Sequence, residues 1–372
     1  MFRADCFRLR KLNKEEIMHI SHLIKKRGLV ASALALLFFL IYNANFRIIS
    51  SGDTLPARLL PVSILLDRSF FLDRFAGLKH SPQGYAIIQR KDGHLISFVP
   101  IATPFIATPI YALPVFILTI RHSQYSSARF YWLLEILEKV SASLITTLSV
   151  LFIYLALYEY TSLFIAVLLS FIYGICTSAW SISSQALWQH GPSMLMLAIG
   201  IYSAIKISQN IHYIHPLVIS AVVLLTIRPS NILFSFAFIW IACKTRSRYL
   251  LLCVIYIIII VGLLIVYNLF IFGDILGLYS KAIAYSIFHP TITTYNPPGA
   301  NILINNPLWS RLPGLLFSPS RGLLVYSPFL IFGFIGLILS WLPVTMSFPH
   351  RVLFRLLILA IGGWLLFAAF FP

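Results

Sequence analysis

Long apolar runs separated by short polar segments fill most of this chain and limit what it can fold into. Apolar residues make up 59% of the 372 residues, charged residues only 10%, and the mean hydropathy is +0.88. Soluble domains carry roughly 25% charged residues, so a water-soluble enzyme and a disordered or collagen-like chain are both excluded. A helix needs about 20 residues to cross a bilayer. The sequence therefore predicts an all-α polytopic membrane protein.

We expect about nine spanning helices. They are predicted at 28–44, 139–158, 162–180, 193–207, 213–227, 231–243, 249–272, 322–342 and 352–370. Two short helices meeting at 227–231 fit the bilayer better than one 29-residue helix kinked at Pro229, which would be about 43 Å long. The positive-inside rule then places the N-terminus, Lys206 and the basic cluster at 244–248 in the cytoplasm.

A tenth apolar run, at 98–120, is interpreted differently because it contains Pro100, Pro104, Pro109 and Pro114. Each proline inside a helix removes a backbone hydrogen bond. The sequence therefore predicts a broken helix that lies at the outer interface instead of spanning.

The predicted organisation is a basic cytoplasmic tail at 1–27 and a transmembrane domain at 28–372. The domain includes outer loops at 45–138 and 273–321. Within the first loop, residues 55–66 are predicted to lie at the interface as a short amphipathic segment. Alternating residues around Asp92 and Gly93 predict a β-hairpin.

The formal net charge of +17 suggests a negatively charged partner. Because no dense basic tract with exposed aromatics lies beyond the N-terminus, we favour lipid phosphate over nucleic acid. The four cysteines show neither zinc spacing nor a disulfide framework and are expected to be inert. There are only 11 acidic residues, and Asp274 is the one acid after Glu159. A reaction that needs a carboxylate therefore has few candidates.

Four polar segments share the predicted outer side: 50–58, 183–193, 228–231 and 273–321. Ionisable groups near a membrane are a functional hypothesis by default. Asp53 has two readings, an N-cap of the next helix or a catalytic carboxylate, and the second needs an oxygen free of hydrogen bonds. We expect the catalytic role.

Basic and aromatic residues of these segments are the candidate binding groups. Donor phosphate is assigned to Arg228, Arg321 and Arg58, and other substrate contacts to His190, Gln189 and Trp188. A guanidinium offers a planar fork for phosphate, although an arginine here could instead reach toward lipid headgroups. His190 could be satisfied structurally by a carbonyl, and Trp188 could belong to an interfacial aromatic belt. No metal ligand is assigned, and a divalent metal stays an open alternative.

No nucleotide-binding, serine-hydrolase or zinc-protease motif occurs in the sequence. Internal repeats are also missing, which weighs against a secondary transporter. The pattern instead resembles the GT-C membrane glycosyltransferases, the group of protein O-mannosyltransferases and lipid A aminoarabinose transferases. The likeness runs from about residue 25 to 342. It rests on "SGDTLPARLLP" with Asp53, "VPIATPFIATPIYALP", "LLTIRPSN" with Arg228, and "SPSRGLLVYSP" at 318–328.

This resemblance implies an inverting sugar transfer from a polyprenyl-phosphate donor to an acceptor hydroxyl on the outer face of a bacterial plasma membrane. Asp53 would be the general base, and Arg228, with Arg321 and His190, would bind the phosphate. Membrane lipids are expected partners, and no cofactor is assigned. The acceptor could be a glycan, a lipid or a protein. The alternatives are an O-antigen-type polymerase or ligase, and a lipid or glycolipid transporter without a reaction.

Overall fold

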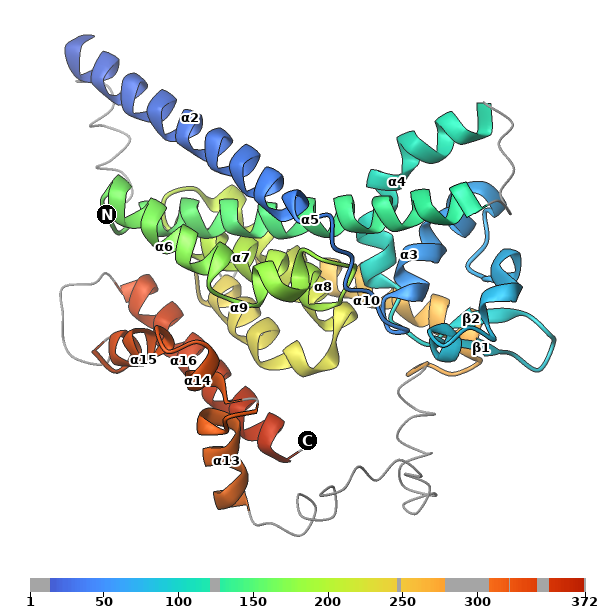
Figure 1. Cartoon of the computed structure of the whole chain (residues 1–372). Coiled ribbons are helices and arrows are strands. Elements are labelled where there is room, and N and C mark those ends of the chain that lie inside the picture. The colour runs from blue at the N-terminus through green and yellow to red at the C-terminus, as the bar shows by residue number, and fades with distance from the viewer. Residues whose placement is uncertain are drawn as a thin grey trace.

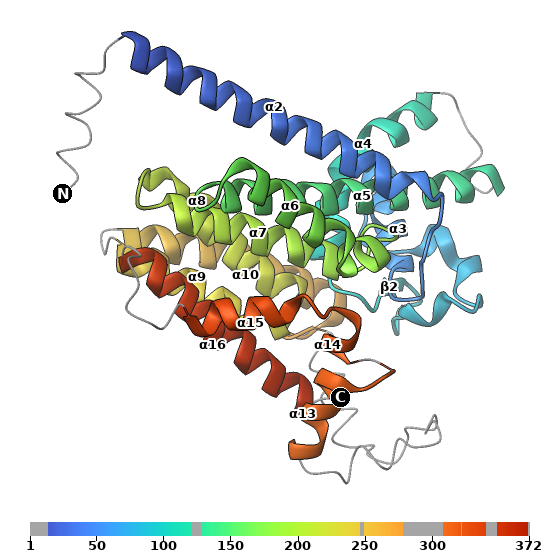
Figure 2. The same cartoon turned by 60° about the vertical axis from the view of Figure 1, so that its left-hand side comes forward.

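A computed structural model describes residues 14–120, 128–245, 249–277, 308–320, 322–339 and 348–370, and this part of the chain is almost entirely helical (Figures 1 and 2). Each predicted apolar run contains a helix. These helices are α2 (Lys14–Ala44), α5 (Ala128–Tyr158), α6 (Leu163–Ile175), α7 (His190–Lys206), α8 (Ile214–Ile227), α9 (Ile232–Thr245), α10 (Leu250–Phe272), α15 (Leu330–Leu339) and α16 (Phe348–Phe370). Two shorter helices, α13 (Leu308–Phe317) and α14 (Leu323–Tyr326), precede α15.

Within the described residues, four helical segments are long and apolar enough to cross a membrane. They are Lys26–Ala44, Ala102–Ile120, Ala128–Tyr158 and Leu250–Phe272. The chain thus has the helices of a membrane protein, and the figure of nine spans stays a prediction. Two boundaries differ from expectation. Helix α2 begins inside the predicted tail, and α5 begins at Ala128, so the predicted loop 45–138 contains its first turns.

The short helix α3 (Leu55–Val62) is buried within the protein, so it does not expose the polar face of the expected amphipathic segment, and its depth relative to a bilayer stays a prediction. All eight of its residues are buried, and its neighbours are α4 (Ala102–Ile120) and α5. The prediction failed because Arg58 looked like the polar face of an amphipathic helix. Its guanidinium is instead neutralised by Glu135 and Glu138 of α5, at 3.1 and 3.6 Å.

Helix α4 is continuous, so the prediction of a broken helix was wrong. It passes through Pro109 and Pro114 and is covered by α3 and α5 on part of its surface. Proline is tolerated in apolar helices when neighbouring helices and hydroxyl side chains compensate for the lost bonds. Here the Thr108 hydroxyl donates to the Pro104 carbonyl oxygen at 2.9 Å, next to the Phe105 carbonyl that Pro109 leaves without a helical N–H donor. Its position relative to a bilayer stays a prediction.

The predicted hairpin is confirmed. Strands β1 (Ile87–Gln89) and β2 (Leu95–Ser97) pair antiparallel, and Gly93 supplies the positive φ, +96°, that the turn requires. Three short helical turns, η2 (Ser63–Asp67), η3 (Asp73–Leu78) and η4 (Gly84–Ala86), lead from α3 to this hairpin. The Arg90 guanidinium donates to the Phe270 carbonyl oxygen at 2.6 Å. The hairpin therefore rests on the C-terminal end of α10, where cations are favoured.

The break between α8 and α9 is also confirmed. A short turn, η7 (Pro229–Asn231), separates the two helices. Proline disfavours helical backbone in the preceding residue, and Arg228 accordingly has extended angles, φ −151° and ψ 127°. The Asn231 amide donates to the Leu224 carbonyl oxygen at 3.1 Å, which satisfies part of the open end of α8.

Helices α2, α5 and α7 are joined at one end by a charged cluster. Glu159, just beyond α5, lies 2.7 Å from the Arg27 guanidinium and 3.1 Å from the Lys206 ammonium group. Burial opposes the charge of Glu159, but hydrogen bonding and charge from Lys206 and then Arg27 outweigh it and lower its pKa. The cluster marks the end of the bundle where α2 enters and α5 and α7 finish.

Replacing Glu159 should destabilise the protein in a pH-dependent way. At pH 7 we expect Glu159→Gln to cost about 2 kcal/mol, because two cations lose a charged acceptor. Since the folded pKa is depressed, the wild-type advantage persists at pH 5 and shrinks only as the pH falls through the folded pKa, below about 4.3. Thermal unfolding in detergent measures this. Asp67→Asn, which removes an exposed partner of Arg74, should have little effect; a pH-independent loss for Glu159→Gln would contradict the assignment.

Candidate functional site

Three of the polar segments predicted to converge lie at the opposite end of the bundle from Glu159. The Trp188 indole N–H donates to the Ile49 carbonyl oxygen at 2.9 Å, and the Asn45 amide donates to Gln185 Oε1 at 3.2 Å. Arg228 Nη1 lies 3.2 Å from His190 Nδ1. We call residues 45–54, 183–190 and 228–231 the loop cluster.

Asp53 sits in a tight turn that leads into α3. Ser51 and Thr54 close this turn: the Ser51 N–H donates to Thr54 Oγ1, and the Thr54 hydroxyl donates to the Ser51 carbonyl oxygen. Thr54, not Asp53, occupies the N-cap position of α3, and no side-chain cap bond forms. The exposed Asp53 carboxylate accepts one hydrogen bond, from the Tyr85 hydroxyl to Oδ1 at 3.1 Å. Its other oxygen, Oδ2, has no protein partner among the described residues.

Gly52 explains how Tyr85 reaches this carboxylate. A Cβ at position 52 would lie 2.1 Å from the Tyr85 ring, far inside van der Waals contact. The missing side chain therefore lets the phenol ring lie against the backbone of the turn, with its hydroxyl at Asp53. The tyrosine comes from η4, next to the hairpin.

Histidine and arginine form a polar pair between α7 and the turn after α8. Because a guanidinium can only donate, His190 Nδ1 must accept, which places the imidazole proton on Nε2. Partial burial, followed by the charge of Arg228, lowers the pKa of His190. At pH 7 the pair thus carries one positive charge and presents an additional N–H donor, a combination suited to a phosphate oxygen.

An apolar pocket of about 270 Å³ lies between the end of α8, α10 and the segment before α4, and neither His190 nor Arg228 lines it. Thr226 and Pro229, on either side of Arg228 in the chain, contribute to its lining. Leu225 of α8, Val99–Ile101 before α4, α10 and the residues just after α10 form the rest of the wall. The chain neighbours of Arg228 thus border an apolar cavity, while its guanidinium lies at His190.

The other predicted site residues differ from these in their exposure and their partners. Arg58 is contradicted as a phosphate ligand because its side chain is only 9% exposed and is paired with two carboxylates. Trp188 and Gln189 adjoin His190, and the Trp188 N–H is already used to hold Ile49. Arg321 lies outside the described residues.

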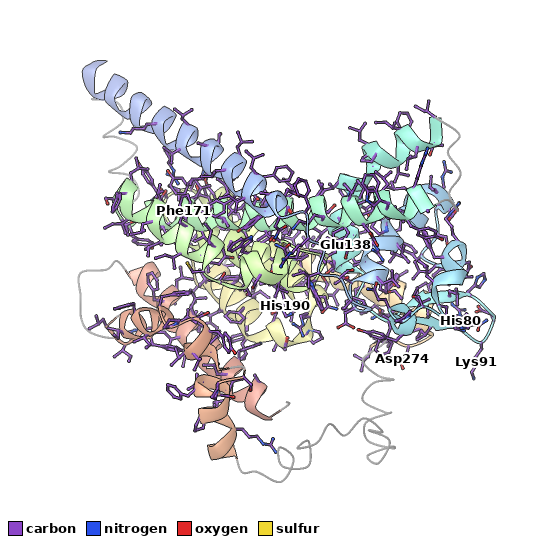
Figure 3. All side chains as sticks on the ribbon, viewed as in Figure 1. His80, Lys91, Glu138, Phe171, His190 and Asp274 are labelled. Atoms are coloured by element: carbon purple, nitrogen blue, oxygen red, sulfur yellow. The ribbon has the colours of Figure 1, made fainter. Side chains whose placement is uncertain are left out.

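A metal set of Asp53, His190 and Asp274 is not assembled in the described part of the chain, where no group of three suitable ligands occurs. Asp274 lies by the hairpin, apart from His190 (Figure 3). Its carboxylate accepts from the Leu276 N–H at 2.8 Å, as a local turn residue does.

Sequence reasoning missed three residues that position the loop cluster: Tyr85, Glu138 and Lys139. The last two are adjacent, oppositely charged and buried in α5. Their signal was present, because ionisable residues at the edge of an apolar run are expensive and need partners. Tyr85 left no such signal, since its role depends on the fold that brings η4 to Gly52.

Comparison with protein-family models, with curated proteins and with solved structures gives no match for this chain. The functional argument therefore depends on the chemistry of the site.

Gly52→Ala should separate Tyr85 from Asp53 with little loss of stability, because the exposed ring can swing away. We expect carbodiimide-dependent labelling of Asp53, quantified by peptide mass spectrometry, to increase. Gly77→Ala is the matched control, since nothing lies within 4 Å of the added Cβ. Equal Asp53 labelling in both variants would contradict the packing of Tyr85 against Gly52.

The positive charge of Arg228 should lower the pH at which His190 becomes protonated. Diethyl pyrocarbonate modifies neutral imidazole, so the pH midpoint of His190 modification should lie below about 6.5 in the wild type. Arg228→Gln should move this midpoint upward, because a positive neighbour is removed. Modification of the exposed His80 is the control for reagent activity. An unchanged His190 midpoint would refute the pairing.

Proposed function

We propose that this protein is a membrane glycosyltransferase that uses a lipid-phosphate-linked sugar. The observation that carries this proposal is the His190–Arg228 pair, whose chain neighbours Thr226 and Pro229 line an apolar pocket, at the same end of the bundle as a carboxylate with an open oxygen. The three features suit the three parts of such a donor and its reaction: phosphate, lipid and acceptor hydroxyl.

The donor phosphate would bind at Arg228, with the Nε2–H of His190 as a second donor. Its lipid would enter the neighbouring pocket between α8, α10 and the start of α4. A cavity of about 150 Å³ holds a benzene molecule, so the 270 Å³ pocket has room for a short length of an isoprenoid chain. We infer that a polyprenyl phosphate is the carrier.

Transfer would proceed by inversion at the anomeric carbon. Asp53 Oδ2 accepts the proton of the acceptor hydroxyl as its oxygen bonds to the sugar. The bond from the anomeric carbon to the phosphate oxygen breaks, and the lipid phosphate leaves with the electron pair. Arg228 stabilises the charge on this leaving group, as preorganised cations do in phosphate chemistry. Tyr85 orients the carboxylate through Oδ1.

The positive-inside rule favours an outward-facing loop cluster, because it places the N-terminal basic residues in the cytoplasm. The proposed location is a bacterial plasma membrane with the site facing the exterior. Lipid carriers that have crossed the membrane supply sugars there without nucleotides. The excess of basic residues suits contact with anionic lipids.

Loss of this activity should leave its donor unused. We expect mass spectrometry of membrane lipids to show a polyprenyl-phosphate sugar that accumulates in cells lacking the protein. Expression of the wild-type protein, or of the hairpin-turn variant Asp92→Asn, in these cells should remove the accumulated lipid. Asp53→Asn should reduce its consumption about 100-fold or more, since general-base catalysis contributes at least that much.

Purified protein separates binding from chemistry. Asp53→Asn should bind polyprenyl phosphate normally, whereas Arg228→Gln should weaken this binding. Full turnover by Asp53→Asn would remove the carboxylate from the mechanism. A transporter would tolerate that substitution and move the lipid without consuming it.

A further inference from the structure

Helix α5 buries two opposite charges on successive residues beneath the loop cluster. Glu138 is 0% exposed and Lys139 is 5% exposed. Moving either charge out of water costs several kcal/mol unless partners compensate. The partners of both side chains are therefore informative; Glu138 is labelled in Figure 3.

Lys139 joins the end of α2 to the segment before His190. Its ammonium group donates to Gln185 Oε1 at 2.6 Å and to the Ser184 carbonyl oxygen at 3.2 Å. A longer bond, 3.4 Å, reaches Asn45 Oδ1, and the Asn45 amide itself donates to Gln185. The Lys139 ammonium group thus contacts two segments of the loop cluster, residues 45–54 and residues 183–190.

Glu138, the residue before Lys139, makes a corresponding link. Its Oε1 accepts the Leu187 N–H at 3.2 Å, three residues before His190. Its Oε2 lies 3.6 Å from the Arg58 guanidinium in α3, the helix that follows Asp53. The Glu138 carboxylate therefore contacts the segment before His190 through a backbone hydrogen bond, and it contacts α3, which follows the Asp53 turn, through an ion pair.

We propose that Glu138 and Lys139 are positioning residues that hold the Asp53 turn and the His190 segment as one unit. Neither side chain touches the proposed substrate positions. The polar atoms of Lys139 contact Gln185, Ser184 and Asn45, and those of Glu138 contact Leu187 and Arg58. The importance of these two residues for catalysis rests on the proposed function. The coupling of the two segments depends on the fold alone.

Hydrogen–deuterium exchange of the full-length protein in detergent tests this coupling without an activity assay. In Lys139→Met we expect exchange within both 45–54 and 184–190 to rise about tenfold or more, since a charge-assisted contact is lost from each. The other helices should keep their protection. An increase confined to one segment, or spread over the whole bundle, would overturn the proposal.

A matched pair isolates the carboxylate. Glu138→Met and Glu135→Met each remove one negative partner of Arg58, but only the first also removes the acceptor of the Leu187 N–H. We expect faster exchange of 184–190 in the first variant only. Should Lys139→Met fail to fold, Asn45→Ala removes a smaller part of the same link and must still loosen both segments.

Kinetics distinguish positioning from simple destabilisation. With the polyprenyl-phosphate sugar of the proposed function as donor, Lys139→Met and Glu138→Met should lose transfer rate while polyprenyl phosphate binding at Arg228 stays unchanged. A loss of rate in proportion to the unfolded fraction would assign these residues to folding only. If Asp53→Asn proves active, the proposed function fails, yet the exchange measurements still decide whether the two segments are coupled.

Discussion

The burial of Glu138 and Lys139 in α5 is the constraint on which the polar end of the bundle depends. Breaking a buried ion pair costs about 3–5 kcal/mol, because the remaining charge is left without compensation. Their partners are therefore fixed: Arg58 in α3, the backbone at 184–187 and Asn45. Segments that are far apart in the sequence are thereby held around one helix, and the helix itself can extend well beyond the predicted apolar run.

At the other end of α5, Glu159 plays a comparable structural part with Arg27 and Lys206. Both ends are organised by a few charges with several partners each, while the middle is packed with small and apolar residues. Gly200 illustrates this packing, because a Cβ there would lie 2.2 Å from the Phe238 ring. Charges fix which helix ends meet, and small residues let α7 approach α9.

Apolar periodicity was enough to predict where helices lie, and Pro229 was enough to predict the break between α8 and α9. It failed where a residue's environment depends on distant segments. Arg58 reads as a polar residue of a surface helix until Glu135 and Glu138 are brought beside it. The prolines of α4 read as helix breakers because the sequence does not show which neighbours cover them. Candidate residues Asp53, His190 and Arg228 stood out by chemistry, whereas Tyr85 needed the folded turn.

The contact between Tyr85 and Asp53 has a consequence for the stereochemistry of the proposed reaction. Because the phenol occupies the side of Oδ1 and the ring covers Gly52, an incoming nucleophile meets competition on that flank and none at Oδ2. The two oxygens of the carboxylate are therefore not equivalent. In the proposed reaction the acceptor would approach Oδ2, and the Tyr85 ring would limit the bulk that fits on its own side of the turn.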